Sequence, residues 1–173
     1  MVSVEVAETV HAEGICRVCT AGWRDAYADV LPSRYVEANI RTFYRPERIA
    51  EQVRSDVDDT WLVALEDSDS STDERVVGAI CDVRSETDIG EVSGLYVSPE
   101  RRGDGVGSRL LSALTERQSE SGVTEQHTFV FADHEDALGF YRSKGFDADE
   151  RFPAATVDGV NPDCESVRLT RSI

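Results

Sequence analysis

Residues 95–111, LYVSPERRGDGVGSRLL, decide the fold of this 173-residue chain. An apolar strand pattern ends at Pro99, whose nitrogen cannot donate a hydrogen bond to a sheet ladder. Three glycines follow at alternate positions, and an apolar-faced helix pattern begins directly after them. Glycines let a backbone turn sharply and approach a ligand closely, and the amides at a helix N-terminus attract anions. The stretch therefore predicts a phosphate-binding loop between a strand and a helix.

Two common nucleotide-binding motifs fit this loop poorly. A Walker loop needs Gly-Lys-Ser/Thr, and the one lysine of the chain is Lys144. A dinucleotide fingerprint that begins at Gly103 would need a glycine where the chain has Ser108. Two adjacent cations, Arg101 and Arg102, flank the loop instead. ATP or NAD as the ligand stays open as a weaker alternative.

Outward from the loop, the apolar patterns predict seven strands and four helices. The strand patterns cover residues 1–6, 60–65, 75–83, 91–97, 126–131, 146–152 and 165–170. The helix patterns cover residues 16–30, 47–54 and 135–144, and a fourth begins near residue 105. The polar stretch 66–74, EDSDSSTDE, predicts a hairpin loop. The order predicts an α+β (mixed α/β) fold, with a central mixed sheet of about six to seven strands and helices on both faces.

Length and composition narrow the class of protein. The length indicates a single domain over residues 1–173. The 34 acidic and 18 basic residues give a net charge of −16, which disfavours binding to nucleic acid or an anionic membrane. With no apolar run near the roughly 18 residues of a membrane span and no visible signal peptide, we expect a cytoplasmic protein. Acidic residues spread along a chain with a single lysine are typical of a halophilic organism.

The remaining conspicuous residues favour structural roles. Cys16 and Cys19 share an apolar helical stripe with Trp23 and Tyr27, and no second cysteine pair or nearby histidine completes a ligand set. Buried small side chains explain the two cysteines better than a metal or redox site. We therefore expect no metal cofactor. His127 is isolated in the sequence and fits an ordinary strand position.

Two motifs in register resemble those of the GCN5-related N-acetyltransferase (GNAT) superfamily. The family motif Arg/Gln-x-x-Gly-x-Gly/Ala is matched by Arg102, Gly105 and Gly107. The second motif, Ala-x-x-Phe-Tyr-x-x-x-Gly-Phe, is matched by Ala137, Phe140, Tyr141, Gly145 and Phe146. The resemblance implies one GNAT domain and direct transfer of an acetyl group from acetyl-CoA to a primary amine. A non-catalytic acyl-CoA-binding or sensor protein on the same scaffold is the alternative.

The resemblance also implies where acetyl-CoA would bind. Its pyrophosphate would lie on the loop formed by Arg102, Gly103, Asp104, Gly105, Val106, Gly107 and Ser108. Its pantetheine arm would run beside the strand at Leu95, Tyr96 and Val97, and an amide near Tyr96 or Val97 would polarise the thioester carbonyl.

Proton transfer and acceptor binding involve other residues in this comparison. Tyr141 occupies the position of the family's general acid, and a phenol stays protonated at neutral pH. Glu91 is the candidate base, with a solvated strand-start glutamate as the plain alternative, and Asp133 and His134 are weaker base candidates. The aromatic residues Trp23, Tyr27 and Tyr35 would line the acceptor site, although aromatics at helical spacing are usually core residues.

The acceptor and the assembly stay open in the sequence. The acceptor would be a small-molecule or peptide amine, such as an amino acid, a polyamine, an antibiotic amine or a protein N-terminus. Its specificity would lie in variable loops over residues 31–44 and 151–163. A homodimer is possible in this family, and the acyl group need not always be acetyl.

Overall fold

The computed structural model describes residues 1–55, 59–67, 69, 75–83 and 87–173. The strands in these ranges are β1 (Val2–Val6), β2 (Asp59–Glu66), β3 (Val76–Val83), β4 (Ile89–Val97), β5 (Glu125–Phe131), β6 (Asp147–Pro153) and β7 (Glu165–Ser172). The helices are α1 (Ala12–Ala26), α2 (Ser33–Phe43), α3 (Pro46–Arg54), α4 (Val106–Glu120) and α5 (Glu135–Ser143), with short 3-10 turns η1 (Thr9–His11) and η2 (Pro99–Arg101). The predicted seven-stranded mixed sheet is confirmed. Most of the expected hairpin loop, at residues 68 and 70–74, lies outside the described residues.

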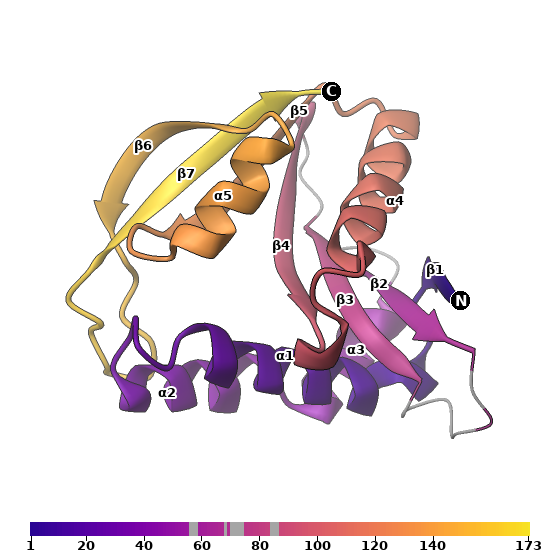
Figure 1. Cartoon of the computed structure of the whole chain (residues 1–173), viewed down its shortest axis with the longest axis horizontal. Helices are drawn as coiled ribbons and strands as arrows, with labels where there is room; N and C mark the ends of the chain where they lie inside the picture. Colours follow the sequence, from indigo (N-terminus) through magenta and orange to yellow (C-terminus); the bar gives the residue numbers. More distant parts are fainter. Residues whose placement is uncertain (56–58, 68, 70–74, 84–86) are drawn as a thin grey trace.

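One sheet joins all seven strands in the order β1-β2-β3-β4-β5-β7-β6. Every neighbouring pair is antiparallel except β4 and β5, which are parallel. Helices α1 and α3 pack with β2 and β3 on one face, while α4 packs on the other face of the same strands. Figure 1 shows β6 and β7 leaning away from β3 and β4, so that the sheet opens like a V.

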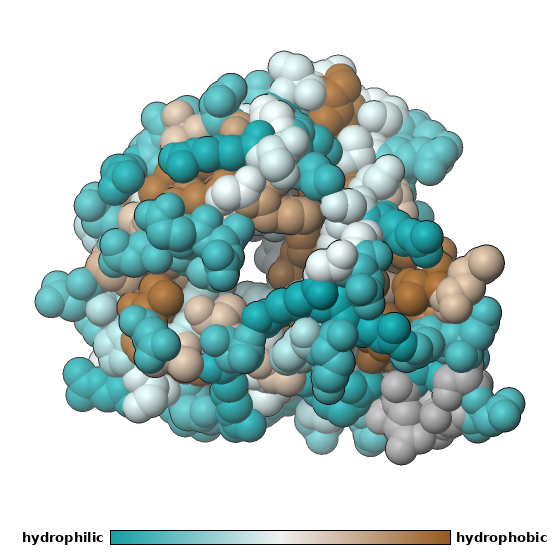
Figure 2. All heavy atoms as spheres, viewed as in Figure 1, coloured by the Kyte–Doolittle hydropathy of each residue, from teal (hydrophilic) through white to brown (hydrophobic). Residues whose placement is uncertain are grey.

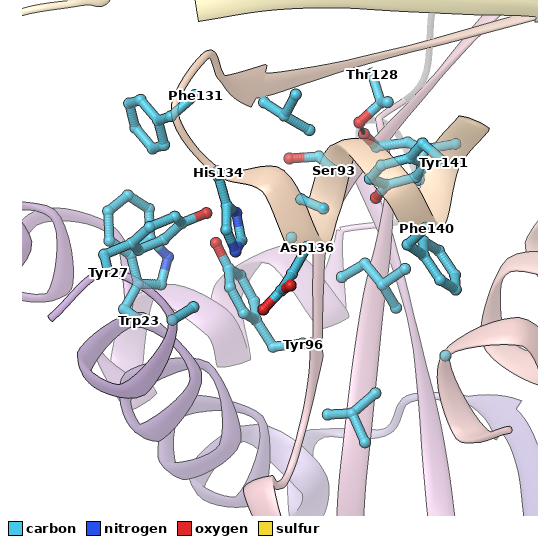
Figure 3. A pocket seen from close by; sticks show the side chains of 18 of the residues that line it. Trp23, Tyr27, Ser93, Tyr96, Thr128, Phe131, His134, Asp136, Phe140 and Tyr141 are labelled. Carbon is cyan, nitrogen blue, oxygen red and sulfur yellow. Dashed lines mark hydrogen bonds between the residues drawn. The ribbon is translucent and has the colours of Figure 1, made fainter. Parts of the chain in front are cut away.

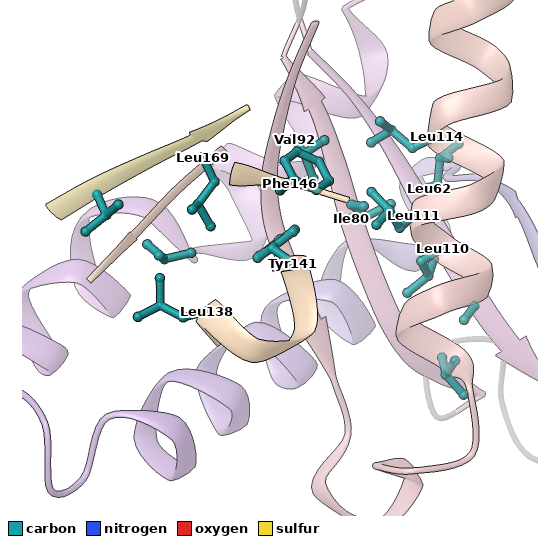
Figure 4. Packing of buried hydrophobic residues seen from close by; sticks show 14 of the residues in the cluster. Leu62, Ile80, Val92, Leu110, Leu111, Leu114, Leu138, Tyr141, Phe146 and Leu169 are labelled. Atoms are coloured by element: carbon teal, nitrogen blue, oxygen red, sulfur yellow. The ribbon is translucent and has the colours of Figure 1, made fainter. Parts of the chain in front are cut away.

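The main core lies between the sheet and helices α4 and α5. Leu110, Leu111 and Leu114 form the inner face of α4, as their spacing predicts, and each is 2% exposed or less. Phe146 and Leu169 fill the part of the same cluster under α5 (Figure 4). The core therefore runs continuously beneath both halves of the V.

A buried polar network joins β3, α4, β5 and β7 at the closed end of the V, which is the end where β4 and β5 pair. Gln118 of α4 donates to Asp82 of β3 at 2.7 Å and accepts from Gln126 of β5 at 2.9 Å. Arg171 of β7 donates to Gln126 at 2.8 Å and stacks over the Phe146 ring. Gln118 and Gln126 are 2% and 0% exposed, so these hydrogen bonds satisfy polar groups that have lost contact with water.

Two expectations about the N-terminal helices need correction. Residues 33–43 form helix α2, whereas a variable loop was expected over residues 31–44. Helix α1 ends at Ala26, and Val30 of the apolar stripe lies in the following turn. Burial against the rest of the protein favours helix α2, since Tyr35 and Val36 are 2% and 4% exposed. In the described part of the chain, no helix is long and apolar enough to span a membrane.

Candidate active site

A gap opens in the sheet where β4 and β5 separate. Their ladder consists of three pairs, the last of which joins Glu91 to His127. Beyond this pair β4 continues to Val97 alongside β3 alone, so its other edge has no strand partner among the described residues. A cavity of about 840 Å³ begins at this edge, and Figure 2 shows the surface hollowed at the middle of the same view.

The ladder between β3 and β4 fixes which backbone groups face the gap. The Ser98 amide donates to Val77, and antiparallel pairs alternate between hydrogen-bonded and non-bonded positions. The next pair, Val97 with Gly78, is therefore a non-bonded pair, and the N–H and C=O of Val97 point away from β3. Gly94, with φ of +59°, marks an irregularity that bends β4 just before this point. A free amide is thus available at Val97 beside the cavity.

The glycine loop forms one end of the cavity. Gly103 and Gly105 have φ of +86° and +81°, a conformation in which other residues are strained. Gly105 is the N-cap of α4, so the first amides of the helix open toward the same space. A Cβ on Gly107 would lie 3.7 Å from Phe140 and from Val97, which is ordinary contact. The loop is therefore a cradle of amides that suits a diphosphate.

The predicted loop and strand residues are almost all brought to this cavity. Its lining includes Leu95, Tyr96, Val97, Arg102, Gly103, Gly105, Val106, Gly107 and Ser108. Asp104 does not line the cavity and instead pairs with Arg101 at 3.7 Å.

Both arginines of the loop are already engaged with carboxylates. Arg102 forms an ion pair with Asp25 at the end of α1, and Arg101 forms one with Glu66 of β2. These contacts join residues far apart in the sequence, so no local pattern indicates them. An anion bound at the loop would have to compete with these carboxylates for the two arginines.

Tyr141 of α5 lines the cavity, beside Phe140 and Thr128 and away from the aromatic group of Trp23 and Tyr27 (Figure 3). Its ring lies between those of Phe140 and Phe146, with centroid distances of 5.2 and 5.3 Å. Burial raises the pKa of Tyr141 to about 12, and the nearby Thr128 hydroxyl offsets this only in part. The phenol therefore keeps its proton at neutral pH and can donate it.

Glu91 lies on the cavity wall at the point where the two strands part. Its side chain is half-buried, and burial raises the pKa of its carboxyl, while the neighbouring His127 lowers it. His127 Nε2 lies 3.6 Å from Glu91 Oε2. A carboxylate with a raised pKa is a better base than one in water, so the environment suits the predicted role.

Aromatic side chains of α1 and the neighbouring segments form the other end of the cavity. Trp23 and Tyr27 line it together with Tyr44, Tyr96 and Phe131. Their rings pack against one another, with Trp23 and Tyr27 centroids 4.6 Å apart. Burial raises the pKa of Tyr27, Tyr44 and Tyr96, so the three hydroxyls stay protonated and neutral.

Tyr35 lies elsewhere. It is 2% exposed, does not line the cavity, and donates its hydroxyl to the Ala155 carbonyl at 2.8 Å. Its contact fastens α2 to the connection between β6 and β7. Tyr35 is therefore an ordinary core residue, whereas Trp23 and Tyr27 both pack in the core and face the cavity.

Several cavity residues escaped the sequence reasoning. Asp25, Asn39 and Tyr44 line the aromatic end, and only the helical spacing of α2 could have indicated Asn39. His134 Nδ1 is buried and has no hydrogen-bond partner within the described ranges. Trp23 is hydrogen-bonded to Tyr44, which partly offsets the effect of burial on the pKa of that tyrosine.

Within the described residues, no three His, Cys, Asp or Glu side chains gather as metal ligands would. Cys16, Cys19 and Cys81 are buried, in keeping with the structural role expected for the Cys16-x-x-Cys19 pair.

Comparisons with known proteins agree with this geometry. Residues 58–148, more than half of the chain, match the family model of the acetyltransferase (GNAT) domain. Spermidine N(1)-acetyltransferase of Thermoplasma acidophilum is 24% identical over 141 residues, which cover 80% of this chain and 83% of that protein. The structure of PaiA N-acetyltransferase from Thermoplasma acidophilum in complex with coenzyme A has a TM-score of 0.83 at 19% identity, covering 100% and 99% of the two chains. A probable acetyltransferase from Staphylococcus epidermidis has a TM-score of 0.77 at 11% identity, covering 99% of each chain.

Proposed function

Because the chain belongs to the GNAT acetyltransferase family and is an N-acetyltransferase, we propose that acetyl-CoA is its donor and that the amine acceptor enters from the aromatic end of the cavity. One observation carries the proposal. The free edge of β4, the glycine loop and the Tyr141 hydroxyl all border the same cavity. A pantetheine arm needs an unpaired strand edge, a diphosphate needs the amide cradle, and a departing thiolate needs an acid.

In the proposed reaction, the Val97 amide donates to the thioester oxygen and stabilises the charge that develops there. Glu91 accepts a proton from the acceptor ammonium, directly or through water. The neutral amine attacks the carbonyl carbon, the C–S bond breaks, and Tyr141 gives its proton to the leaving thiolate. The acylated nitrogen then loses its second proton, which returns to the Tyr141 phenolate and leaves a neutral amide. The products are an N-acetylated amine and CoA. Since the amine attacks directly, no side chain of the protein is acetylated.

The acceptor is proposed to be a primary amine of a small molecule or a peptide. The aromatic end supports an amine that presents an apolar or cationic part to the rings of Trp23 and Tyr27, because both kinds of group pack well on aromatic faces. Asn39 and His134 are polar residues of the same wall. Spermidine, by likeness to the Thermoplasma acidophilum relative, and a short peptide with a free N-terminus are the first acceptors to assay.

Substitution of Gly107 tests the donor site. In Gly107→Glu, the carboxylate would repel the diphosphate at the cradle, and no positive φ strains the new residue. We expect acetyl-CoA and CoA to raise the melting temperature of the wild type, because saturation at about 100 times Kd adds roughly 2.7 kcal/mol. We expect that shift to disappear in Gly107→Glu.

Gly107→Ala is the matched control, since its methyl group makes only ordinary contacts and should keep the shift. ATP and NAD provide the ligand control in the same thermal titration. Equal stabilisation by ATP, or by CoA in both variants, would mean that the loop does not hold the CoA diphosphate.

The acidic surface is proposed to be an adaptation to high salt, with the single domain of residues 1–173 working in a concentrated electrolyte. A net charge of −16 repels itself and a polyanionic donor at low salt. The Debye length falls from about 10 Å at 0.1 M to about 3 Å at 1 M, which removes most of this repulsion. We expect the melting temperature to rise with KCl and the affinity for acetyl-CoA to hold or improve. Calorimetry across a KCl series measures both, and a steep loss of affinity with salt would contradict the proposal.

A further inference from the structure

The last pair of the β4–β5 ladder joins two titratable side chains. Parallel pairing places Glu91 directly beside His127, and their side chains approach to 3.6 Å between Oε2 and Nε2. The two residues are far apart in the sequence, and His127 has no feature there that marks it as functional. The tertiary structure alone makes them neighbours, at the point where the cavity begins.

The two side chains occupy different surroundings. Glu91 lines the cavity, whereas His127 lies outside it. The His127 side chain is 24% exposed and contacts the Phe129 ring, with centroids 5.2 Å apart. Asp149 of β6 lies further along the same side, close enough for His127 to lower its pKa. The pair therefore connects the cavity wall to a partly exposed side chain beside the cavity.

We propose that His127 takes the acceptor's proton from Glu91 and passes it to solvent through its own partly exposed side chain, outside the cavity. The inference rests on the proposed function, in which Glu91 is the base. The acceptor ammonium loses H⁺ to the Glu91 carboxylate and becomes a neutral amine. The Glu91 carboxyl gives that proton to His127 Nε2, which restores the carboxylate and forms an imidazolium. The imidazolium releases the proton to water or buffer, so each turnover returns both groups to their starting state.

The relay would act while the cavity is filled. Donor and acceptor together would cover the cavity side of Glu91, and His127 offers its proton a route that does not wait for product release. Histidine suits the exit because an imidazole exchanges protons readily near neutral pH. His127 acts through Glu91 and does not touch the substrates, so its role is that of a positioning residue.

Five titratable side chains of the described residues surround the pair. Asp59 of β2 raises the pKa of Glu91, and Glu91 in turn raises that of the Cys81 thiol in β3. On the outer side, Asp149 is hydrogen-bonded to Arg168 of β7 at 2.8 Å, and Glu150 lies 3.6 Å from the same arginine. Arg168 is thus held by carboxylates, and the groups nearest the relay are predominantly acidic, which favours movement of a proton outward.

Chemical rescue tests the relay. In His127→Ala we expect kcat to fall about 10-fold or more, since general acid–base groups contribute roughly 10²–10⁴-fold and water can replace part of the relay. Added imidazole should enter the vacated, partly exposed site and restore most of the lost kcat. His127→Gln fills the space without a titratable group, so we expect the same loss and no rescue. Thr170→Val, which changes the cross-strand neighbour of His127 on β7, is the matched control and should keep wild-type kinetics.

The pH profile gives a second kinetic readout. His127 lowers the pKa of Glu91, so its removal should move the acidic limb of kcat/KM to higher pH. Activity would then be lost earlier as the pH falls. A His127→Ala enzyme with wild-type kcat and an unmoved acidic limb would overturn the inference.

An NMR measurement tests the contact between Glu91 and His127 independently of the proposed function. Long-range ¹H–¹⁵N spectra of the imidazoles, with acetyl-CoA absent, should show the His127 Nε2 signal shift in Glu91→Gln while the His11 signals stay. An unchanged His127 signal would mean that the pair does not form in solution, whatever the enzyme acetylates. Absence of acetyl transfer by the wild type together with a shifted signal would instead remove the proposed function, and with it the relay's role.

Discussion

Tyr141→Phe is expected to lower kcat about 10²–10⁴-fold while the KM for acetyl-CoA stays close to that of the wild type. The hydroxyl is the group proposed to protonate the departing thiolate, and the substitution removes only that oxygen. The ring packing against Phe140 and Phe146 is kept.

Because burial raises the pKa of Tyr141 to about 12, the wild-type phenol stays protonated across the accessible pH range. Tyr141 itself should therefore add no alkaline limb to the pH–rate profile below about pH 10. Steady-state kinetics with spermidine or a peptide acceptor measure both effects.

The controls for this variant are its melting temperature and its thermal shift with acetyl-CoA, both of which should match the wild type. A variant that binds acetyl-CoA normally and turns over at the wild-type rate would show that water, and not Tyr141, protonates the thiolate.

Gly90→Ala is expected to lower the free energy of unfolding by roughly 2–4 kcal/mol, through overpacking and lost hydrogen bonds. A Cβ at Gly90 would lie 2.5–2.7 Å from the amide group of Gln118. Gln118 cannot simply move aside, because its amide holds Asp82 and Gln126 in the buried network at the closed end of the V. Urea denaturation of the wild type and the variant measures the difference.

A double-mutant cycle tests whether the clash with Gln118 causes the loss of stability. In a Gln118→Ala background the amide is gone, so Gly90→Ala should cost far less than it does in the wild type. An equal cost in both backgrounds would assign the loss to the strand itself and not to the network.

Local patterns predicted much of this fold from the sequence. Pro99 ends β4 and the glycines open α4 as expected, because proline and glycine act through their own backbone geometry. The apolar face of α4 followed equally from its spacing. The same reasoning treated residues 31–44 as a loop, since α2 gains its stability from burying Tyr35 and Val36 against the rest of the protein.

The candidate site was predictable only in part. The loop residues and Tyr141 stand in motifs, so their grouping in one cavity could be expected from the family resemblance. The ion pair of Arg102 with Asp25 and the pairing of Glu91 with His127 depend on how distant segments meet. Tyr35 shows the opposite error. It was expected to line the acceptor site with Trp23 and Tyr27, but its side chain turns toward the core, where its hydroxyl donates to the Ala155 carbonyl.

The two ends of the cavity draw on different stretches of the chain. The glycine loop, β4 and Tyr141 all fall within residues 58–148, the segment that matches the family model. Of the residues at the aromatic end, Trp23, Tyr27, Asn39 and Tyr44 lie before that segment, whereas Tyr96 and Phe131 lie within it. The proposed donor end thus comes from the matched segment alone, whereas the aromatic end joins that segment to α1, α2 and Tyr44. Substitutions at Trp23, Tyr27 or Asn39 would change the wall proposed to face the acceptor and leave the sequence of the glycine loop unaltered.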